Sequence, residues 1–206
     1  MDSECSLFGV FGGVVQLILA FVCFSSLVIK RYTERPLRSW PIFALDTSKQ
    51  AFSALVAHVM NIMGALILSQ RQEGNPCMWY FITLMMDTTI GVLIAYSFIR
   101  LSEKISRNYG WTKAISGNYS EDTDEEIDLA AWALQLMIWV SIVAMTKWFL
   151  LMVITHFSEF YMEIGKKALT PFSENPKFEL VFVMVMVPAV MNIFQFWVQD
   201  NFLKAI

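Results

Sequence analysis

Residues 131–154 read AWALQLMIWVSIVAMTKWFLLMVI, a run of 24 residues with a single charged side chain, Lys147. A helix needs about 20 mostly apolar residues to cross the roughly 30 Å hydrocarbon layer of a bilayer. This run is long enough and apolar enough to span a membrane. It therefore predicts a membrane protein rather than a water-soluble domain.

Four further segments have the same character on either side of this run. Together they predict five spans, at about residues 8–29, 45–68, 78–99, 131–154 and 178–198. Only the last contains a proline, Pro188, and proline is tolerated in membrane helices as a kink. We therefore expect one polytopic membrane domain over residues 1–206. Its fold class is an all-α membrane protein, a bundle of five transmembrane helices.

The composition supports this class and excludes others. The 206 residues are 56% hydrophobic and only 16% charged, with a mean hydropathy of +0.52, whereas soluble domains carry about 25% charged residues. The net charge of -3 argues against nucleic-acid binding, because phosphate contacts need a basic face. The first six residues hold Asp2 and Glu4 and no base, so the first apolar run lacks the positive start of a signal peptide and should be retained.

The connections between the spans differ in positive charge, and positive residues mark the cytoplasmic side. The second connection holds Arg71 as its only base, and the fourth holds three lysines. The first and third hold four bases each: Lys30, Arg31, Arg35 and Arg38, and then Arg100, Lys104, Arg107 and Lys113. This bias predicts a lumenal N-terminus and a cytoplasmic C-terminus. The acidic run at residues 121–126 counts for little in the rule and is expected to be a solvated loop.

Ionisable side chains within the spans are informative, because they are costly in hydrocarbon and usually face the bundle interior. The helical rise places His58 and Asp87 near the midplane, with Lys147 in reach. Asp87 should therefore pair with Lys147 or with His58. Asp46 and Lys49 lie at the predicted cytoplasmic rim, where the lysine is expected to snorkel to water. Other polar side chains share faces of the second and fifth spans: Gln50, Ser53, Asn61, Asn192, Gln195 and Gln199.

Two interpretations of these polar groups stay open. They are either paired groups that hold the bundle together, or the lining of a cavity for an ion, a proton or a lipid headgroup. The two histidines do not supply the three or four ligands of a zinc site. No Ser-His-Asp signature, phosphate-binding loop or HExxH motif occurs. We therefore expect no metal, no cofactor and no catalytic residue.

Glycines and cysteines give further expectations. Gly9 and Gly13 form a small-xxx-small pair that lets another helix approach the first span closely. Cys23 lies inside that span and should be a buried free thiol. Cys5 and Cys77 precede the first and third spans on the predicted lumenal side, where disulfides form. We expect a Cys5–Cys77 disulfide if these two spans are neighbours, because the bond needs Cα atoms within about 7 Å.

Several stretches resemble the STIMATE family. They are LDTSKQA at 45–51, His58, Asn61, DTTIG at 87–91, ENP at 174–176, Val187-Pro188, Asn192, FWV at 196–198 and DNFL at 200–203. The resemblance covers nearly all of residues 5–203. It adds two residues to the intramembrane polar cluster, which then comprises Asp46, Lys49, His58, Asn61, Asp87, Lys147, Asn192, Asp200 and Asn201.

The resemblance implies an endoplasmic-reticulum membrane protein that regulates store-operated calcium entry. Family members associate with the calcium sensor STIM at membrane junctions, and fungal relatives are described as vacuolar membrane proteins. The organelle is therefore expected to be the endoplasmic reticulum, with a vacuolar or other endomembrane as the alternative. Vertebrate members carry a long charged tail after the last span, whereas this sequence ends at Ile206. Functions that depend on that tail are not carried over.

Two functional hypotheses follow. The first is a non-enzymatic regulator of calcium entry that contacts its single-span partner through the face of Gly9 and Gly13. The alternative is a small intramembrane enzyme or transporter that acts on a lipid or an ion through a polar midplane cavity. The expected partners are the lipid bilayer, a STIM-type calcium sensor and a bound lipid, and not nucleic acid.

Overall fold

The computed structural model describes residues 10–71, 76–119, 127–172 and 174–204. These residues contain helices and connections and no strand. Five of the helical segments are long and apolar enough to cross a membrane: Gly13–Thr33, Trp40–Arg71, Pro76–Asn108, Leu129–His156 and Phe178–Leu203. The predicted fold class, an all-α membrane protein with five spanning helices, is confirmed.

Three of the five spans are single helices, and two contain a wider turn. The single ones are α1 (Val10–Thr33), α2 (Trp40–Arg71) and α5 (Leu129–His156). The third span is made of α3 (Pro76–Met86), the π-helical turn η1 (Asp87–Gly91) and α4 (Val92–Asn108). The fifth is made of α7 (Pro176–Val181), the π-helical turn η4 (Phe182–Met186) and α8 (Val187–Leu203).

Local chemistry accounts for both π-helical turns. Pro188 has no backbone N–H to close an α-helical bond with the carbonyl of Met184, which lies in η4. In the third span, the hydroxyls of Thr88 and Thr89 donate to the carbonyls of Leu84 and Met85, at 2.9 and 2.6 Å. Side chains that bond to carbonyls in this way loosen or bend a helix. The proline was foreseen as a kink, but neither turn was predicted.

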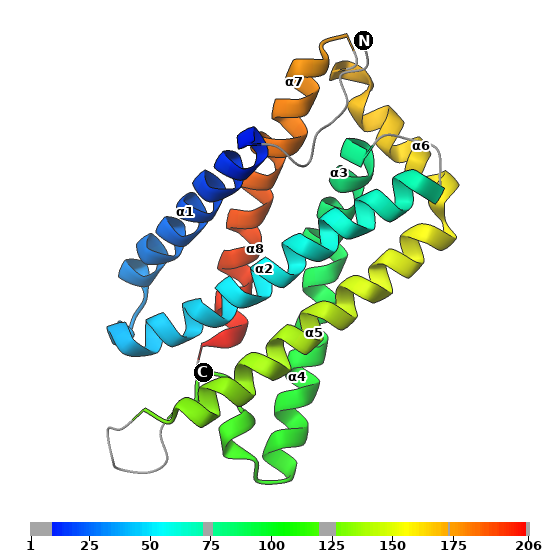
Figure 1. Ribbon diagram of the computed structural model, residues 1–206. Coiled ribbons are helices and arrows are strands. Elements are labelled where there is room, and N and C mark those ends of the chain that lie inside the picture. The colour runs from blue at the N-terminus through cyan, green and yellow to red at the C-terminus, as the bar shows by residue number, and fades with distance from the viewer. Residues whose placement is uncertain (1–9, 72–75, 120–126, 173, 205–206) are drawn as a thin grey trace.

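Three of the spans pack together through α2, α3 and α5, and α1 and α8 form a pair beside them (Figure 1). The helices α2 and α5 run side by side, and α3 packs against α2. On the other side α1 packs mainly against α8. From their common connection at residues 34–39, α1 and α2 diverge, so the first two spans are neighbours only near that end.

The largest apolar core lies where α3 meets α2, α5 and a short helix, α6 (Ser158–Leu169). Trp79 of α3 is fully buried in this core. Gly165 of α6 is required for the close approach, because a Cβ there would lie 2.7 Å from Cγ of Met78 and 2.8 Å from Cδ1 of Ile82. The core therefore ties α6 to the start of the third span.

The connections are more structured than the sequence indicated. The third span continues as a helix beyond residue 99 to Asn108, and residues 112–114 form the short 3-10 helix η2. The fourth connection contains α6, followed by the 3-10 turn η3 (Thr170–Phe172). At the start of α5, Asp128 caps the helix by accepting from the N–H groups of Ala130 and Ala131. The acidic run at 121–126 lies outside the described residues.

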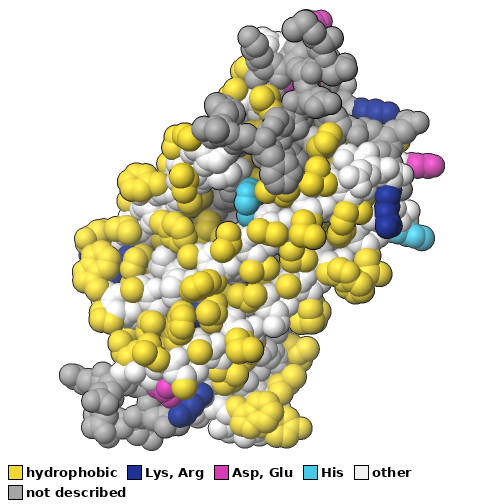
Figure 2. Space-filling view, in the orientation of Figure 1, with side chains coloured by type: hydrophobic (Ala, Val, Ile, Leu, Met, Phe, Trp, Pro, Cys, Tyr) yellow, Lys and Arg dark blue, Asp and Glu magenta, His cyan; other side chains and the backbone are white. Residues whose placement is uncertain are grey.

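The outer surface is that of a membrane protein. Figure 2 shows apolar side chains spread over most of the visible face, with charged groups near its ends. Exposed apolar side chains come from several spans, including Phe21, Met137 and Val190. A contiguous apolar surface of this extent is unusual in a soluble monomer. We therefore treat these side chains as lipid-facing.

The orientation in the membrane stays a prediction, and Asn118 offers a test of it. Asn118-Tyr119-Ser120 is a glycosylation sequon that the positive-inside bias places in the cytoplasm. We expect the protein from native membranes to show no endoglycosidase-sensitive mobility shift. A shift that disappears in Asn118→Gln would reverse the proposed orientation.

Candidate functional site

The first group of polar residues surrounds two buried carboxylates at the end of the bundle predicted to be cytoplasmic. We call it the end cluster (Lys30, Glu34, Arg38, Asp46, Lys49, Gln50, Tyr119, Asp200 and Asn201). Asp200 of α8 is fully buried at its centre. Its carboxylate accepts hydrogen bonds from Lys30 Nζ at 2.8 Å and Arg38 Nη2 at 2.9 Å. Lys30 also donates to Asn201 Oδ1 at 2.8 Å. Asp200 and Asn201 are thus held by the end of α1 and by the connection that follows it.

Asp46 of α2 is the second fully buried carboxylate of the end cluster. It accepts from Arg38 Nη1 at 3.1 Å and from the Tyr119 hydroxyl. Arg38 therefore bridges Asp46 and Asp200, and it also pairs with Glu34 at 2.8 Å. Burial and the neighbouring Asp46 raise the pKa of Tyr119, so the phenol stays protonated and can donate to the carboxylate.

The prediction that Lys49 snorkels to water is wrong. Its side chain is 0% exposed, and its ammonium lies 3.3 Å from Asp46 Oδ1. The ammonium also donates to Gln135 Oε1 at 3.1 Å and Ser116 Oγ at 3.3 Å. Ser116 belongs to the third connection, which folds over the rim of α2, and Gln135 belongs to α5. The carboxylate and the two hydrogen-bond acceptors compensate the buried ammonium for its lost hydration, so the side chain can stay inside the protein.

The second group lies in the middle of the bundle and joins three spans, and we call it the midplane triad (Asn61, Asp87 and Lys147). Lys147 of α5 donates to Asn61 Oδ1 at 2.7 Å and pairs with Asp87. Asp87 is the first residue of the π-helical turn η1, a feature that recurs at functional sites. Of the two partners expected for Asp87, the structure shows Lys147.

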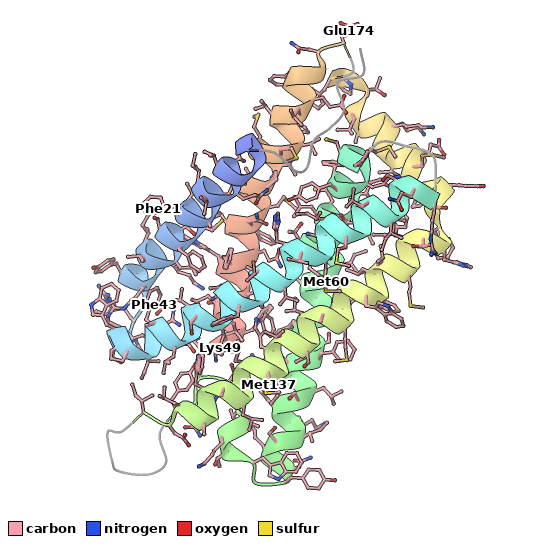
Figure 3. The ribbon with its side chains drawn as sticks, viewed as in Figure 1. Phe21, Phe43, Lys49, Met60, Met137 and Glu174 are labelled. Carbon is pink, nitrogen blue, oxygen red and sulfur yellow. The ribbon has the colours of Figure 1, made fainter. Side chains whose placement is uncertain are left out.

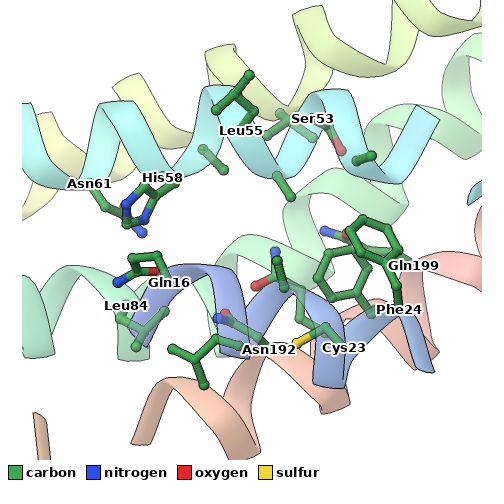
Figure 4. Close-up of a pocket in the computed structure, with 18 of the residues that line it drawn as sticks. Gln16, Cys23, Phe24, Ser53, Leu55, His58, Asn61, Leu84, Asn192 and Gln199 are labelled. Carbon is green, nitrogen blue, oxygen red and sulfur yellow. The ribbon is translucent and has the colours of Figure 1, made fainter. Parts of the chain in front are cut away.

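A cavity of about 310 Å³ lies in the angle between α1 and α2, with α8 along its other side. Figure 4 shows His58 and Asn61 extending from α2 towards Gln16 of α1, with Asn192 and Gln199 further along the cavity. Lys147 of the midplane triad also borders the cavity. Its polar lining residues are Gln16, Ser53, His58, Asn61, Tyr80, Lys147, Asn192, Gln195 and Gln199.

The structure thus distributes the predicted cluster over three places. Asp46, Lys49, Asp200 and Asn201 belong to the end cluster (Figure 3 labels Lys49). The midplane triad holds Asn61, Asp87 and Lys147. His58 and Asn192 line the cavity without joining either group. The single cluster foreseen from the sequence is two charged groups and a cavity between them.

The remaining candidates concern the first span and the cysteines. Gly13 is exposed, and a Cβ built there would meet nothing within 4 Å. Cys23 is a buried free thiol, as predicted. Cys77 is buried at the start of α3. Gly9 and Cys5 lie outside the described residues, so the helix-packing pair and the Cys5–Cys77 disulfide stay predictions.

Sequence reasoning missed four members of the end cluster, Lys30, Glu34, Arg38 and Tyr119, and two partners of Lys49, Ser116 and Gln135. The two bases were counted only as markers of the cytoplasmic side. Gln135 donates to the carbonyls of Lys113 and Asn118 at 3.1 and 2.8 Å, which fixes the third connection against α5. One signal was available: Arg38 lies eight residues before an acid in a predicted span, close enough to fold back onto it.

The arrangement is suited to structure and binding more than to covalent chemistry. The hydroxyl of Ser53 already donates to the carbonyl of Gln50 at 3.0 Å and accepts from Trp139 Nε1 at 2.9 Å. It therefore has no base to activate it as a nucleophile. Among the residues that the structure covers, no group of three or more His, Cys, Asp or Glu side chains could hold a metal ion.

Comparison with known proteins places the chain in a family. A vacuolar membrane protein of Saccharomyces cerevisiae is 25% identical over 217 aligned positions, which cover 97% of this chain and 79% of the relative. No solved structure matches the chain. The family model of the STIMATE family matches residues 77–205, from the start of the third span to the end of the fifth. That match covers more than half of the sequence, and the chain belongs to the STIMATE family.

Proposed function

We propose that this protein is a multi-pass membrane protein of the endoplasmic reticulum that regulates store-operated calcium entry by associating with a STIM-type calcium sensor at membrane junctions. The observation that carries the proposal is the STIMATE family match over residues 77–205. The yeast relative is described as a vacuolar membrane protein, so a vacuolar membrane is the alternative location.

The geometry of α1 supports contact with a partner helix. One side of α1 packs on α8, while its other side carries exposed apolar residues such as Leu17 and Phe21. Gly13 leaves open space where a side chain would stand. Small residues let two membrane helices approach closely enough for good packing. A single-span partner could therefore lie along the face that contains Gly9 and Gly13.

Regulation by this route requires a difference in affinity. A protein shifts the equilibrium of its partner only by binding one of the partner's states better than the other. We propose that this chain binds the active state of the sensor better and thereby raises the active fraction. No covalent step is involved.

Co-purification tests the proposed contact. The sensor should be recovered with this protein from detergent-solubilised membranes, and Gly9→Leu with Gly13→Leu should lower its recovery. A loss of about 1.4 kcal/mol of binding would weaken the complex about tenfold. Val190→Leu, at an exposed position on α8, serves as a control that should leave the recovery unchanged.

Two results would count against the contact. Failure of the unmodified protein to recover the sensor would overturn the association itself. Full recovery with the double glycine variant would remove the α1 face from the proposal.

The cavity favours a second candidate, a small intramembrane protein that binds or moves a lipid or an ion. The observation behind it is the polar lining, which includes His58, Asn192 and Gln195. Because the Ser53 hydroxyl of the lining has no base to activate it, the cavity supports binding or transport more than catalysis. Its occupant is a separate question from the contact with the sensor.

A further inference from the structure

The cavity contains hydrogen-bonding groups that the protein itself leaves unused. The side chain of Gln199 lines the cavity and is only 6% exposed. Within the described part of the chain it makes no hydrogen bond, and neither do the side chains of His58, Asn192 and Gln195. Buried polar groups in folded proteins are nearly always hydrogen-bonded, and an unmade bond costs about 1–3 kcal/mol. Gln199, the buried one of the four, therefore indicates a polar occupant, and the half-buried His58, Asn192 and Gln195 line the same space.

The cavity opens on the apolar outer surface of the bundle. Leu17 of α1 and Leu55 of α2 border it and are 74% and 62% exposed. Leu55 lies in the middle of the second span and Leu17 near the start of the first, and both belong to the apolar outer surface of the bundle. Figure 2 shows a histidine set in a hollow of this face. An occupant can therefore enter sideways from the bilayer, between the diverging helices α1 and α2.

The charge of the lining favours an uncharged occupant. Among the lining residues that the structure describes, Lys147 alone carries a full charge. Its ammonium forms an ion pair with Asp87 and a hydrogen bond with Asn61. No unpaired cation remains among the described lining residues to hold a phosphate. Bringing a phosphate to this depth would also be costly, because charged groups are expensive in hydrocarbon. Amide and imidazole side chains both donate and accept, which suits hydroxyl, ester and amide groups.

The spacing of the lining amides favours a head with more than one such group. Asn192, Gln195 and Gln199 follow one another at three and four residues, so they lie on one face of α8. They extend over about 10 Å at the helical rise. A single hydroxyl, as in a sterol, would leave most of this row unused.

We propose that the cavity binds the head of an uncharged membrane lipid that carries several hydroxyl, ester or amide groups, with its chains leaving between α1 and α2. Diacylglycerol and ceramide both have this chemistry. The proposal does not depend on the contact with the calcium sensor.

Photolabelling of the purified 206-residue chain in phosphatidylcholine nanodiscs tests the proposal. Photoactivatable diacylglycerol and ceramide are added separately, and the labelled peptides are identified by mass spectrometry. We expect at least one probe to label peptides of α1, α2 or α8 that border the cavity. Unlabelled diacylglycerol or ceramide should compete, while phosphatidic acid with the same chains and cholesterol should not. The probe that labels the cavity at the lower concentration shows which of the two lipids the cavity prefers.

Two variants and a control make the test specific. Ala20→Trp fills the cavity from a lipid-exposed position on α1, and Gln195→Leu with Gln199→Leu removes two of its hydrogen-bonding groups. Each should weaken labelling about tenfold or more, Ala20→Trp because the indole takes the space of the lipid head, and the double glutamine variant because one or two hydrogen bonds are lost. Val190→Trp adds the same bulk at an exposed position outside the lining and should label like the unmodified protein.

The proposal is wrong if the label spreads evenly over the lipid-facing helices, or if neither variant weakens it. Equal competition by phosphatidic acid would refute the uncharged head, and equal competition by cholesterol would refute the need for several groups. Because no sensor is present in the nanodiscs, these results leave the proposed role in calcium entry untouched.

Discussion

Replacing Asp87 by Asn should lower the unfolding temperature of the detergent-purified protein more than any single change on its lipid-facing surface. After the substitution, the buried Lys147 ammonium keeps its hydrogen bond to Asn61 but loses its ion pair with the Asp87 carboxylate. Removing one member of a buried ion pair costs about 3–5 kcal/mol in soluble proteins. The cost in a membrane protein should be smaller, because polar groups there find other partners.

Two further variants show whether the effect belongs to the pair. Adding Lys147→Met to Asp87→Asn removes the stranded charge, so it should restore part of the lost stability. The matched control is Glu163→Gln in the exposed pair with Lys167 on α6, whose side chains are 67% and 76% exposed. Exposed pairs contribute at most about 1 kcal/mol, so this change should be nearly neutral. If both Asp87→Asn and the double variant were neutral, the two residues would not form a structural pair.

The division between paired and unpaired polar groups guides our interpretation of the bundle. In the end cluster and the midplane triad, each carboxylate has at least one cationic partner, which suits a structural role. The end cluster joins α1, α2, α8 and the third connection through Arg38 and Tyr119. Three amides of the cavity, Asn192, Gln195 and Gln199, make no hydrogen bond in the described part of the chain, whereas Asn61 accepts from Lys147. We therefore assign cohesion to the charged groups and binding to the amides.

The five spans could be predicted from the sequence because each is a long apolar run. The residues 131–154 alone required a membrane, and α5 contains all of them. The pairing of Asp87 with Lys147 followed partly from depth, since both lie near the middle of their helices. Depth in the membrane alone left His58 as an equally good partner for Asp87, because depth does not show which helices are neighbours.

The cavity and the partners of the end cluster depend on how the helices pack, which cannot be predicted from the apolar runs of the sequence. The cavity exists because α1 packs against α8 and diverges from α2. The sequence of an apolar run does not show which neighbouring helix it will pack against. The burial of Lys49 depends on Gln135 of α5 and on Ser116, which reaches it from a connection that was expected to be solvated. Lys30 and Arg38 resembled ordinary flanking charges until the fold brought them to Asp200, more than 160 residues away in the sequence.

Store-operated calcium entry tests the proposed regulation most directly. The cells should express a STIM-type sensor and lack their own member of the STIMATE family. After the stores are emptied, the initial rate of calcium entry should be higher with this chain than without it. A coupling of about 1 kcal/mol between the two proteins would change the ratio of active to inactive sensor about fivefold.

The measurement compares three cell lines at matched sensor levels: cells without the chain, cells with it, and cells with Gly9→Leu and Gly13→Leu. We expect the unmodified chain to raise the initial rate and the double variant to raise it much less, with equal amounts of both proteins in the membrane. Equal rates in the presence and absence of the unmodified chain would contradict its proposed role as a regulator of calcium entry.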